Sequence, residues 1–257
     1  MNALTGRVAL VTGGSRGLGR EMVHAFADAG ADVVIASRKE DACLRVAEEI
    51  RGRTGRRALG IGCHVGRWAD LDRLVDRVYA EFGHVDVLVN NAGMSPLYPS
   101  LSEISEELYD KVFATNLKGP FRLSALVGER MTAGSGGSII NISSIAAIRP
   151  STNELPYAAA KAGLNTITQG FALALGPKVR VNCIMVGPFL TDISASWDVE
   201  SFSAFAEERY ALGRLGNPPE IVGTALYLAS DASSFTTGAV IPVDGGVSLS
   251  LPFPQGL

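Results

Sequence analysis

The chain has 257 residues, and 23 lysines and arginines against 26 aspartates and glutamates give it a formal net charge of −3. Hydrophobic residues make up 47% of the sequence, which excludes a disordered chain and is enough for a large core. The slightly acidic balance argues against nucleic acid or an anionic membrane as a partner, and no apolar run approaches the ~20 residues of a membrane-spanning helix.

Short β-branched runs alternate with segments of helical periodicity along the chain. Strands are predicted at Arg7–Thr12, Asp32–Ala36, Ala58–Val65, Val85–Val89, Ser138–Ile142, Val179–Ile184 and Ala239–Val243. Helices are predicted at Gly17–Ala29, about Lys39–Arg51, Trp68–Phe82, Glu103–Met131 with a bend near Gly119-Pro120, Pro156–Leu175 and Pro219–Ala229. Continuous apolar strands and helical crossovers predict an α/β fold: a doubly wound, seven-stranded, mostly parallel Rossmann-type sheet in a single domain over residues 1–257.

Between the last two predicted strands, residues 190–214 carry no clear periodicity. Phe189, Trp197, Phe202 and Phe205 lie in or beside this stretch. We expect Leu190–Arg214 to form a mobile lid over an apolar substrate, since lids are drawn from regions of low stability. The alternative is an ordinary helix with its apolar face in the core.

A glycine-rich turn, Thr12-Gly13-Gly14-Ser15-Arg16-Gly17-Leu18-Gly19, joins the first strand to its helix. Glycines suit this place because side chains would keep a pyrophosphate from the N–H groups at the helix N-terminus. The alternative is a turn that only packs tightly. The predicted cofactor-binding residues here are Gly13, Ser15, Arg16, Gly17, Leu18 and Gly19.

The end of the second strand decides which nucleotide is expected. An enzyme that uses NAD places an acidic residue there, about 20 residues after the glycines, to hold the ribose 2′-OH. This chain has Ala36-Ser37-Arg38-Lys39 instead. Ser37 and Arg38, joined by Arg16, suit a 2′-phosphate, so NADP(H) is the preferred cofactor and NAD(H) the alternative. The competing interpretation is that Arg38 and Lys39 are merely solvated charges.

Tyr157 and Lys161 stand four residues apart at the start of a helix and therefore share one face. A phenol has a reference pKa of ~10, and a nearby ammonium group lowers it. Upstream, Ser143 and Ser144 end a buried strand, which is where ligands of doubly wound sheets bind. We expect Ser143 to cap a turn and Ser144 to donate to a substrate oxygen.

With these motifs the chain resembles the short-chain dehydrogenase/reductase family. The resemblance rests on TG-x-x-x-G-x-G, Y-x-x-x-K, Asn90-Asn91-Ala92-Gly93, Asn116 and Val243-Asp244-Gly245-Gly246. It implies that Tyr157 is the general acid/base and that Lys161 lowers its pKa and binds the nicotinamide ribose. It further implies that Ser144 orients the carbonyl or hydroxyl and that Asn116 holds a water in a proton relay. Further cofactor contacts are implied at Asn91, Ala92, Gly93, Gly187 and Thr191.

Two places depart from the family pattern. The family usually has Asp-Val after the third strand, where the aspartate meets the adenine amino group, whereas this chain has Cys63-His64-Val65. His64 and Val65 are therefore predicted to contact the adenine, His64 as a hydrogen-bond acceptor. The family usually has Pro-Gly after the sixth strand, and here the order is Val186-Gly187-Pro188.

The preferred hypothesis is an oxidoreductase that moves a hydride between NADP(H) and a ketone or secondary alcohol, in the reductive direction. A 3-oxoacyl thioester is one candidate substrate. The alternatives are an NAD-dependent alcohol dehydrogenase of the same family and a catalytically silent nucleotide-binding regulator. An enoyl reductase would have a longer Tyr-to-Lys spacing, and a hydrolase would have the G-x-S-x-G motif.

The remaining expectations concern surroundings and partners. Cys43, Cys63 and Cys183 lie far apart in sequence, so no disulfide framework and no metal site are predicted, and a cytoplasmic location fits. The apolar helices predicted at Glu103–Met131 and Pro156–Leu175 add to the homotetramer that the resemblance implies, with a dimer as the alternative. Substrate selection is assigned to Ser95–Ser100, Ser151–Leu155 and Phe189–Tyr210.

Overall fold

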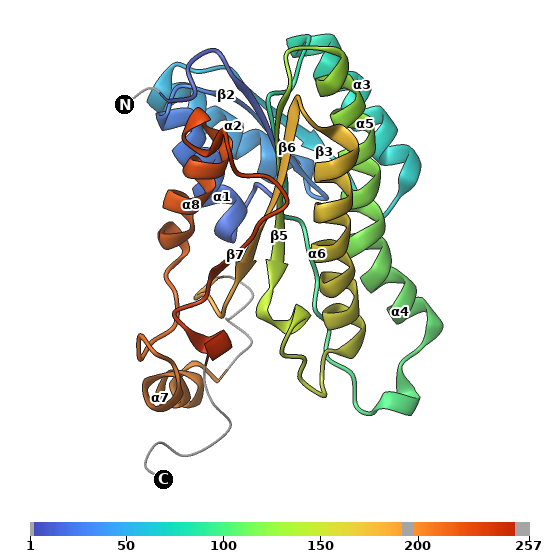
Figure 1. The fold of residues 1–257 in the computed structure, drawn as a ribbon, viewed down its shortest axis with the longest axis vertical. Helices are drawn as coiled ribbons and strands as arrows, with labels where there is room; N and C mark the ends of the chain where they lie inside the picture. Colours follow the sequence, from blue (N-terminus) through green and yellow to red (C-terminus); the bar gives the residue numbers. More distant parts are fainter. Residues whose placement is uncertain (1–2, 192–197, 250–257) are drawn as a thin grey trace.

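A computed structural model describes residues 3–191 and 198–249 and shows one sheet of parallel strands (Figure 1). The strands are β1 (Val8–Thr12), β2 (Asp32–Ser37), β3 (Ala58–Gly62), β4 (Val87–Asn90), β5 (Gly137–Ser144), β6 (Val179–Val186) and β7 (Val240–Val243). Their order is β3-β2-β1-β4-β5-β6-β7, and each neighbouring pair is parallel. The predicted Rossmann-type sheet is confirmed.

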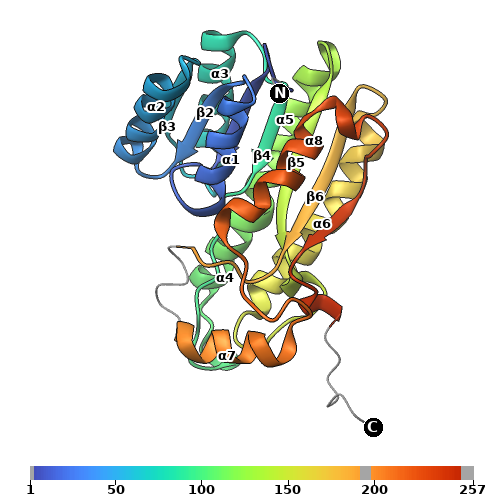
Figure 2. The same cartoon turned by 90° about the vertical axis from the view of Figure 1, so that its left-hand side faces the viewer.

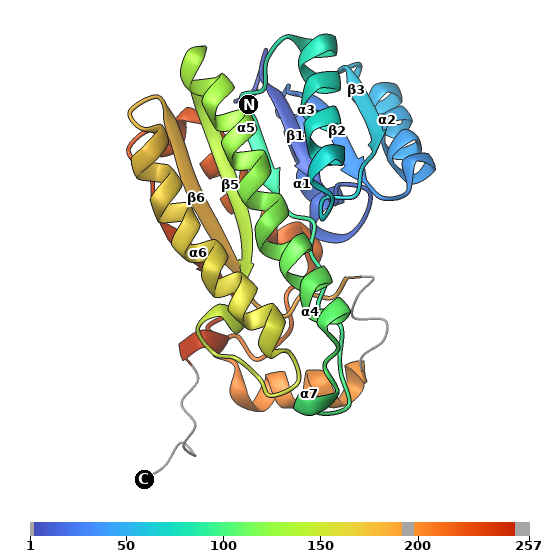
Figure 3. The same ribbon diagram turned by 90° about the vertical axis from the view of Figure 1, so that its right-hand side faces the viewer.

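Helices cover both faces of this sheet. They are α1 (Gly17–Asp28), α2 (Glu40–Thr54), α3 (Trp68–Phe82), α4 (Glu106–Phe113), α5 (Gly119–Ala133), α6 (Leu155–Leu175), α7 (Val199–Arg209) and α8 (Val222–Ala229). Figure 2 shows α1, α2 and α8 on one face, and Figure 3 shows α3, α5 and α6 on the other. Alternate residues of a strand serve the two cores: Val11 packs in the core with Phe26 of α1, whereas Leu10 packs in the core with Leu74 of α3.

The long helix predicted at Glu103–Met131 is divided. A turn of π-helix, Ala114–Lys118, joins α4 to α5, and Pro120 begins α5, where a proline is tolerated. The change of pitch therefore comes before the predicted bend at Gly119-Pro120. Single π-turns inside α-helices are frequent at functional sites, and this one contains Asn116.

Some strand ends differ from the prediction in ways that shape the site. β5 and β6 each run two residues further, because Ser144 pairs with Val186, which in turn pairs with Val243. β3 stops at Gly62 rather than Val65, because the backbone N–H of His64 turns to the Asp70 carboxylate.

The segment 190–214 contains a helix, α7, which the sequence offered as the alternative to a lid. α7 lies beyond the carboxyl ends of the strands (Figures 1 and 2), and its Ala206 is buried, while Phe202 and Phe205 are 40% and 52% exposed. The predicted alternative, a helix with its apolar face in the core, is therefore wrong for these aromatic residues. Trp197 lies outside the described residues. In the described part of the chain, no helix has the length and apolarity to cross a membrane.

Candidate active site

The carboxyl ends of the parallel strands bring the predicted residues to one edge of the sheet. Thr12, Ser37, Asn90, Ser144 and Val186 are the last residues of β1, β2, β4, β5 and β6. The strand order reverses between β1 and β4, and in doubly wound sheets ligands bind outside such a reversal. This edge is therefore the candidate site.

The glycine-rich turn leaves backbone donors available at the start of α1. Gly13 and Gly17 have φ values of +66° and +51°, which favour glycine. A Cβ at Gly13 would lie 2.7 Å from Asn91 Nδ2, so a side chain does not fit there. Arg16, the N-cap residue, is extended and makes no side-chain cap bond. Helix N–H groups without a side-chain cap fit a pyrophosphate. Gly19 is buried, and Leu18 packs against the core below.

Thr12 holds the glycine turn against the loop that follows β4. Its hydroxyl donates to Val89 O at 3.2 Å and accepts from the backbone N–H groups of Asn91 and Ala92 at 3.0 and 3.2 Å. The Asn91 side chain donates back to Thr12 O at 2.9 Å. Asn91 and Ala92, both predicted cofactor contacts, are thus positioned by a threonine whose role the sequence did not reveal. The one sequence signal for this role of Thr12 is its position at the end of a predicted strand.

At the end of β2 two hydroxyl groups meet. Ser15 Oγ donates to Ser37 Oγ at 2.9 Å, and Ser37 Oγ also lies 3.0 Å from the buried Cys43 Sγ. Arg16 and Arg38 are exposed, and in the described chain neither guanidinium makes a hydrogen bond or an ion pair. These hydroxyls and free cations suit a phosphate group.

The acidic residue nearest in sequence to Arg38 does not argue against a phosphate site at the end of β2. Glu40, in the first turn of α2, pairs with Arg77 at 3.6 Å. Its charge is therefore partly balanced, and the end of β2 carries no carboxylate of its own.

His64 presents a donor rather than the expected acceptor. Its Nδ1 accepts from the backbone N–H of Gly66 at 3.1 Å. In a neutral imidazole one nitrogen accepts and the other carries the hydrogen, so Nε2 is the donor that remains. The prediction that His64 accepts a hydrogen bond from the adenine therefore does not fit this structure. Val65, beside it, is buried.

Ser144, Tyr157 and Lys161 come together where β5 ends and α6 begins. The side chain of Ser144 is hydrogen-bonded to that of Tyr157, and Lys161 Nζ lies 5.6 Å from the centroid of the Tyr157 ring. Lys161 is 4% exposed, and its Nζ donates to Ile142 O at 2.7 Å. The spacing that predicted a shared face is thus realised in three dimensions.

The titration behaviour of this pair differs from the expectation. Burial raises the pKa of Tyr157 to about 12, while the hydrogen bond from Ser144 acts to lower it. Burial lowers the pKa of Lys161 to about 8. The expected lowering of the Tyr157 pKa by Lys161 is not found: burial and the negative charge of Glu154 raise this pKa, and the hydrogen bond with Ser144 is the influence that lowers it.

Of the two serines at the end of β5, Ser144 and not Ser143 caps the turn. Ser144 Oγ accepts from the backbone N–H of Ala146 at 3.2 Å and so caps the short helix Ile145–Ala147. Ser143 Oγ donates to Lys161 O at 3.3 Å instead. Ser144 therefore both caps a turn and contacts Tyr157, since a hydroxyl can donate and accept at once.

Asn116, which lies in the π-turn, is hydrogen-bonded to the loop that follows β4. Its Nδ2 donates to Met94 O at 2.8 Å and to Val112 O at 2.9 Å, and its Oδ1 accepts from Met94 N at 3.2 Å. A Cβ at Gly93 would lie 3.0 Å from Asn116 Oδ1 and 3.6 Å from Lys161 Nζ, so the glycine keeps this space open. Both amide hydrogens of Asn116 are in use, and its role in holding a water stays a prediction.

The strand end at β6 contributes Gly187 and Thr191. Gly187 packs so closely against Asp244 that an added Cβ would lie 2.7 Å from Asp244 Cα. The displaced Pro188 accepts from Gly216 N at 3.0 Å, which anchors this altered segment. A Cβ at Gly17 would lie 3.6 Å from Thr191 Cβ, so Thr191 faces the glycine turn as a cofactor contact requires.

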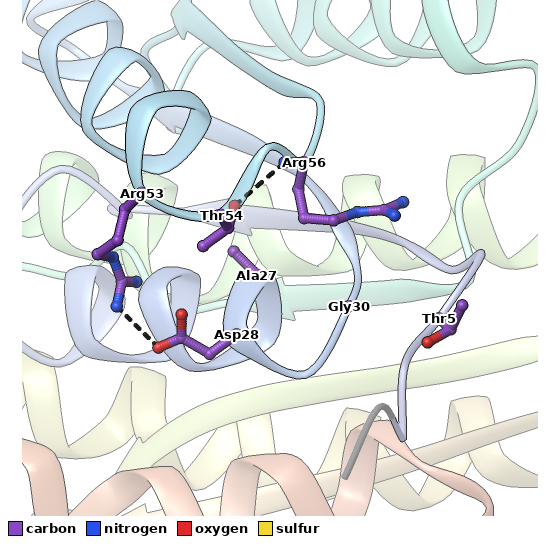
Figure 4. A pocket seen from close by; sticks show the side chains of 7 residues that line it. All are labelled: Thr5, Ala27, Asp28, Gly30, Arg53, Thr54 and Arg56. Atoms are coloured by element: carbon purple, nitrogen blue, oxygen red, sulfur yellow. Dashed lines mark hydrogen bonds and ion pairs between the residues drawn. The ribbon is translucent and has the colours of Figure 1, made fainter.

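A hollow of about 330 Å³ lies at the opposite, amino-terminal edge of the sheet (Figure 4). Its Arg53 turns to Asp28 at 2.9 Å, and its Arg56 pairs with Asp32 at 2.7 Å. It lies where α1 and α2 end, and these helix termini carry partial negative charge. We assign it no chemistry. The described residues also contain no group of three or more side chains suited to a metal ion.

Known proteins match nearly the whole chain. Residues 13–248 match a family model described as enoyl-(acyl carrier protein) reductase. The L-rhamnose 1-dehydrogenase (NAD(P)(+)) of Azotobacter vinelandii is 39% identical over 259 residues, covering 96% of this chain and 99% of that protein. Human dehydrogenase/reductase SDR family member 4 is 34% identical over 245 residues, covering 95% and 88%.

Solved structures agree with these matches. A gluconate 5-dehydrogenase from Burkholderia cenocepacia J2315, in complex with NADP and tartrate, has a TM-score of 0.92 and 32% identity, covering 97% of this chain and 98% of that one. Fold, site and relatives together show that the chain belongs to the short-chain dehydrogenase/reductase family and is an NAD(P)-dependent oxidoreductase that acts on alcohols or carbonyl compounds.

Proposed function

We propose that the protein reduces a ketone to a secondary alcohol with NADPH and that Tyr157 is its general acid. One observation carries this proposal: Ser144, Tyr157 and Lys161 converge at the strand edge that also holds the glycine turn. The cofactor, when bound, supplies the hydride, and the protein residues supply the proton and the alignment.

The residues divide the work according to their chemistry. The hydroxyls of Ser144 and Tyr157 are hydrogen-bonded to each other. When the substrate binds, they would give up that bond, and each would donate its one hydrogen to the substrate oxygen and stabilise the negative charge that develops on it. Tyr157 then gives up its proton. Lys161 would bind the nicotinamide ribose and stabilise the phenolate that Tyr157 leaves behind.

The reductive direction is supported by the state of Tyr157. A pKa raised to about 12 keeps the phenol protonated at neutral pH, which suits a proton donor. Oxidation of an alcohol needs the phenolate, which is scarce under the same conditions.

NADP(H) is proposed over NAD(H) because the end of β2 offers two hydroxyls and free guanidinium groups instead of a carboxylate. The remaining proposed contacts are Gly13, Gly17, Leu18, Gly19, His64, Val65, Asn91, Ala92, Gly93, Gly187 and Thr191.

We also propose a cytoplasmic homotetramer formed from a single-domain chain. Exposed apolar side chains support the assembly: Phe121 on α5 and Leu173 on α6 are 45% and 87% exposed, and Phe235 near β7 is fully exposed. Light scattering at micromolar concentration should return about four chain masses, and a monomer mass would contradict the assembly.

An assay of NADPH oxidation tests the enzymatic proposal. The purified protein is mixed with NADPH and a panel of ketones, and the absorbance of the reduced nicotinamide is followed. The panel includes hydroxylated ketones, because two of the matched enzymes are named for L-rhamnose and gluconate, and a 3-oxoacyl thioester. A silent nucleotide-binding regulator would bind NADPH and oxidise none of it.

Lys161→Ala should lose both rate and cofactor affinity.

A further inference from the structure

The carboxylate of Glu154 lies beside Tyr157 without any evident structural duty. Glu154 is the N-cap residue of α6, yet its side chain makes no cap bond to that helix. Its one hydrogen bond in the described chain comes from Ser95 Oγ, at 3.3 Å to Oε2, and no lysine, arginine or histidine there pairs with it. A carboxylate offers about four acceptor sites, so most of its capacity is unused.

The position of Glu154 places that capacity next to the reacting group. Glu154 is the N-cap of the helix whose third residue is Tyr157, and its negative charge acts on the Tyr157 hydroxyl. Ser95 belongs to the loop after β4, so the Ser95–Glu154 bond joins the two loops that flank Ser144 and Tyr157.

The electrostatics point the same way. Burial is the main cause of the raised pKa of Tyr157, and the negative charge of Glu154 raises that pKa further. The helix macrodipole favours a negative charge at this N-terminus, which explains why a carboxylate is tolerated there. It does not explain a side chain that reaches across to Ser95 rather than capping its own helix.

We propose that Glu154 binds the substrate and selects carbonyl compounds that carry a hydrogen-bond donor, a hydroxyl or an ammonium, on the carbon next to the reacting carbonyl. The inference rests on the proposed function, in which Tyr157 holds the carbonyl oxygen. A donor one carbon away then falls within reach of the carboxylate of Glu154. Substrates that carry a carboxylate at that position would be repelled.

Three ketones of equal size test this selection. Hydroxyacetone, aminoacetone and 2-butanone differ only in the group on the carbon next to the carbonyl, which is a hydroxyl, an ammonium or a methyl. Steady-state kcat and KM are measured with NADPH for the wild type, Glu154→Gln, Glu154→Leu and Glu154→Ala. Glu103→Leu is the matched control, because Glu103 also accepts from a serine hydroxyl, that of Ser100 at 2.7 Å, but stands on a separate short helix.

The wild type should favour at least one of the two donor ketones over 2-butanone by roughly tenfold to a hundredfold in kcat/KM, mainly through KM. Glu154→Leu and Glu154→Ala should bring that ratio close to one, and Glu103→Leu should leave it unchanged. Glu154→Gln separates the two donors: its amide oxygen still accepts from a hydroxyl, whereas the attraction to an ammonium is lost.

Equal ratios in the wild type and the leucine and alanine variants, or a wild-type ratio near one, would overturn the role of Glu154 and leave the proposed reduction standing. Failure of all three ketones and of the wider panel to oxidise NADPH would overturn the proposed function itself. Thermal melting confirms that each variant is folded. Two variants without an acceptor, Glu154→Leu and Glu154→Ala, are measured so that the test still works if one of them does not fold.

Discussion

Ser15 Oγ donates to Ser37 Oγ across 2.9 Å, so the loop after β1 and the end of β2 are joined by two hydroxyl groups. Ser37 stands where an NAD-dependent enzyme would present a carboxylate to the ribose, and Ser15 reaches it from the glycine-rich turn. Such a pair can donate to a phosphate oxygen, and no negative charge at the end of β2 repels it.

Arg38→Ala should therefore weaken the preference for NADPH. One charge-assisted contact is worth roughly a tenfold to a hundredfold factor, so the wild type should favour NADPH over NADH by about that much in kcat/KM. The variant should lose most of this preference, with NADH kinetics nearly unchanged. Arg45→Ala, which removes an exposed arginine from α2 itself, is the control. Equal cofactor ratios in wild type and Arg38→Ala would remove Arg38 from the site.

Tyr157→Phe should abolish turnover with little change in NADPH affinity. The ring still packs, while the proton donor is gone, so a loss of several orders of magnitude in kcat is expected. Rates are compared with Tyr79→Phe, since burial raises the pKa of Tyr79 too but that residue lies on α3. A Tyr157→Phe enzyme that kept most of its kcat would refute the mechanism.

Lys161→Met should change how stability depends on pH in the cofactor-free protein. Burial lowers the pKa of Lys161 from 10.5 to about 8, so protonation of the folded state costs on the order of 3 kcal/mol relative to the unfolded chain. That cost is fully present below about pH 8. It fades as the pH rises towards 10.5, because the folded state has already released a proton that the unfolded chain still holds.

Chemical denaturation measures this effect as the difference between wild type and Lys161→Met. The free energy of unfolding of the variant, relative to wild type, should be highest near neutral pH and should fall towards about pH 10. Taking a difference cancels buried groups that do not interact with Lys161, such as Cys63, whose raised pKa is common to both proteins. A difference that does not change with pH would contradict the lowered pKa of Lys161.

Much of this fold was readable from the sequence because its strands are buried on both faces. The strands β1, β2 and β4 each contain an unbroken apolar run, and a continuous apolar run marks a central parallel strand. The local motifs were readable for a similar reason: the glycine turn and the Tyr157–Lys161 pair are set by nearby residues, so spacing alone places them.

Other features depend on contacts that no local pattern encodes. The π-turn at Ala114–Lys118 has the same apolar spacing as the helices beside it, so periodicity did not separate α4 from α5. The bounds of α7 were not predicted, because Phe202 and Phe205 do not face the core and a helix without a buried stripe lacks the pattern that would reveal its limits. Thr12 acts through side-chain bonds to a distant loop. Glu154 and Ser95 lie in segments that the sequence assigned to substrate selection, but the bond between them could not be predicted.

Amide hydrogen exchange should show whether α7 belongs to a lid. α7 lies beyond the carboxyl ends of the strands and has one buried residue, Ala206, so few contacts hold it in the free protein. We expect its amides to exchange more slowly when NADP and the product alcohol are bound, while those of α3 stay the same. If the exchange rates in Val199–Arg209 are the same with and without both ligands, α7 is an ordinary surface helix and not part of a lid.

His64 should make the protein tolerant of a deaminated cofactor. Nδ1 of His64 accepts from Gly66 N–H at 3.1 Å, which leaves Nε2–H as a donor where the family's aspartate is an acceptor. The adenine amino group is itself a donor and gains nothing from Nε2–H, whereas the carbonyl oxygen of hypoxanthine accepts from it. Titration calorimetry should therefore find the hypoxanthine analogue of NADPH bound at least as tightly as NADPH. In His64→Asp the order should reverse by roughly tenfold, as one hydrogen bond to a charged acceptor allows. A wild-type protein that prefers the adenine form, with His64→Asp unchanged from it, would show that His64 does not face the base.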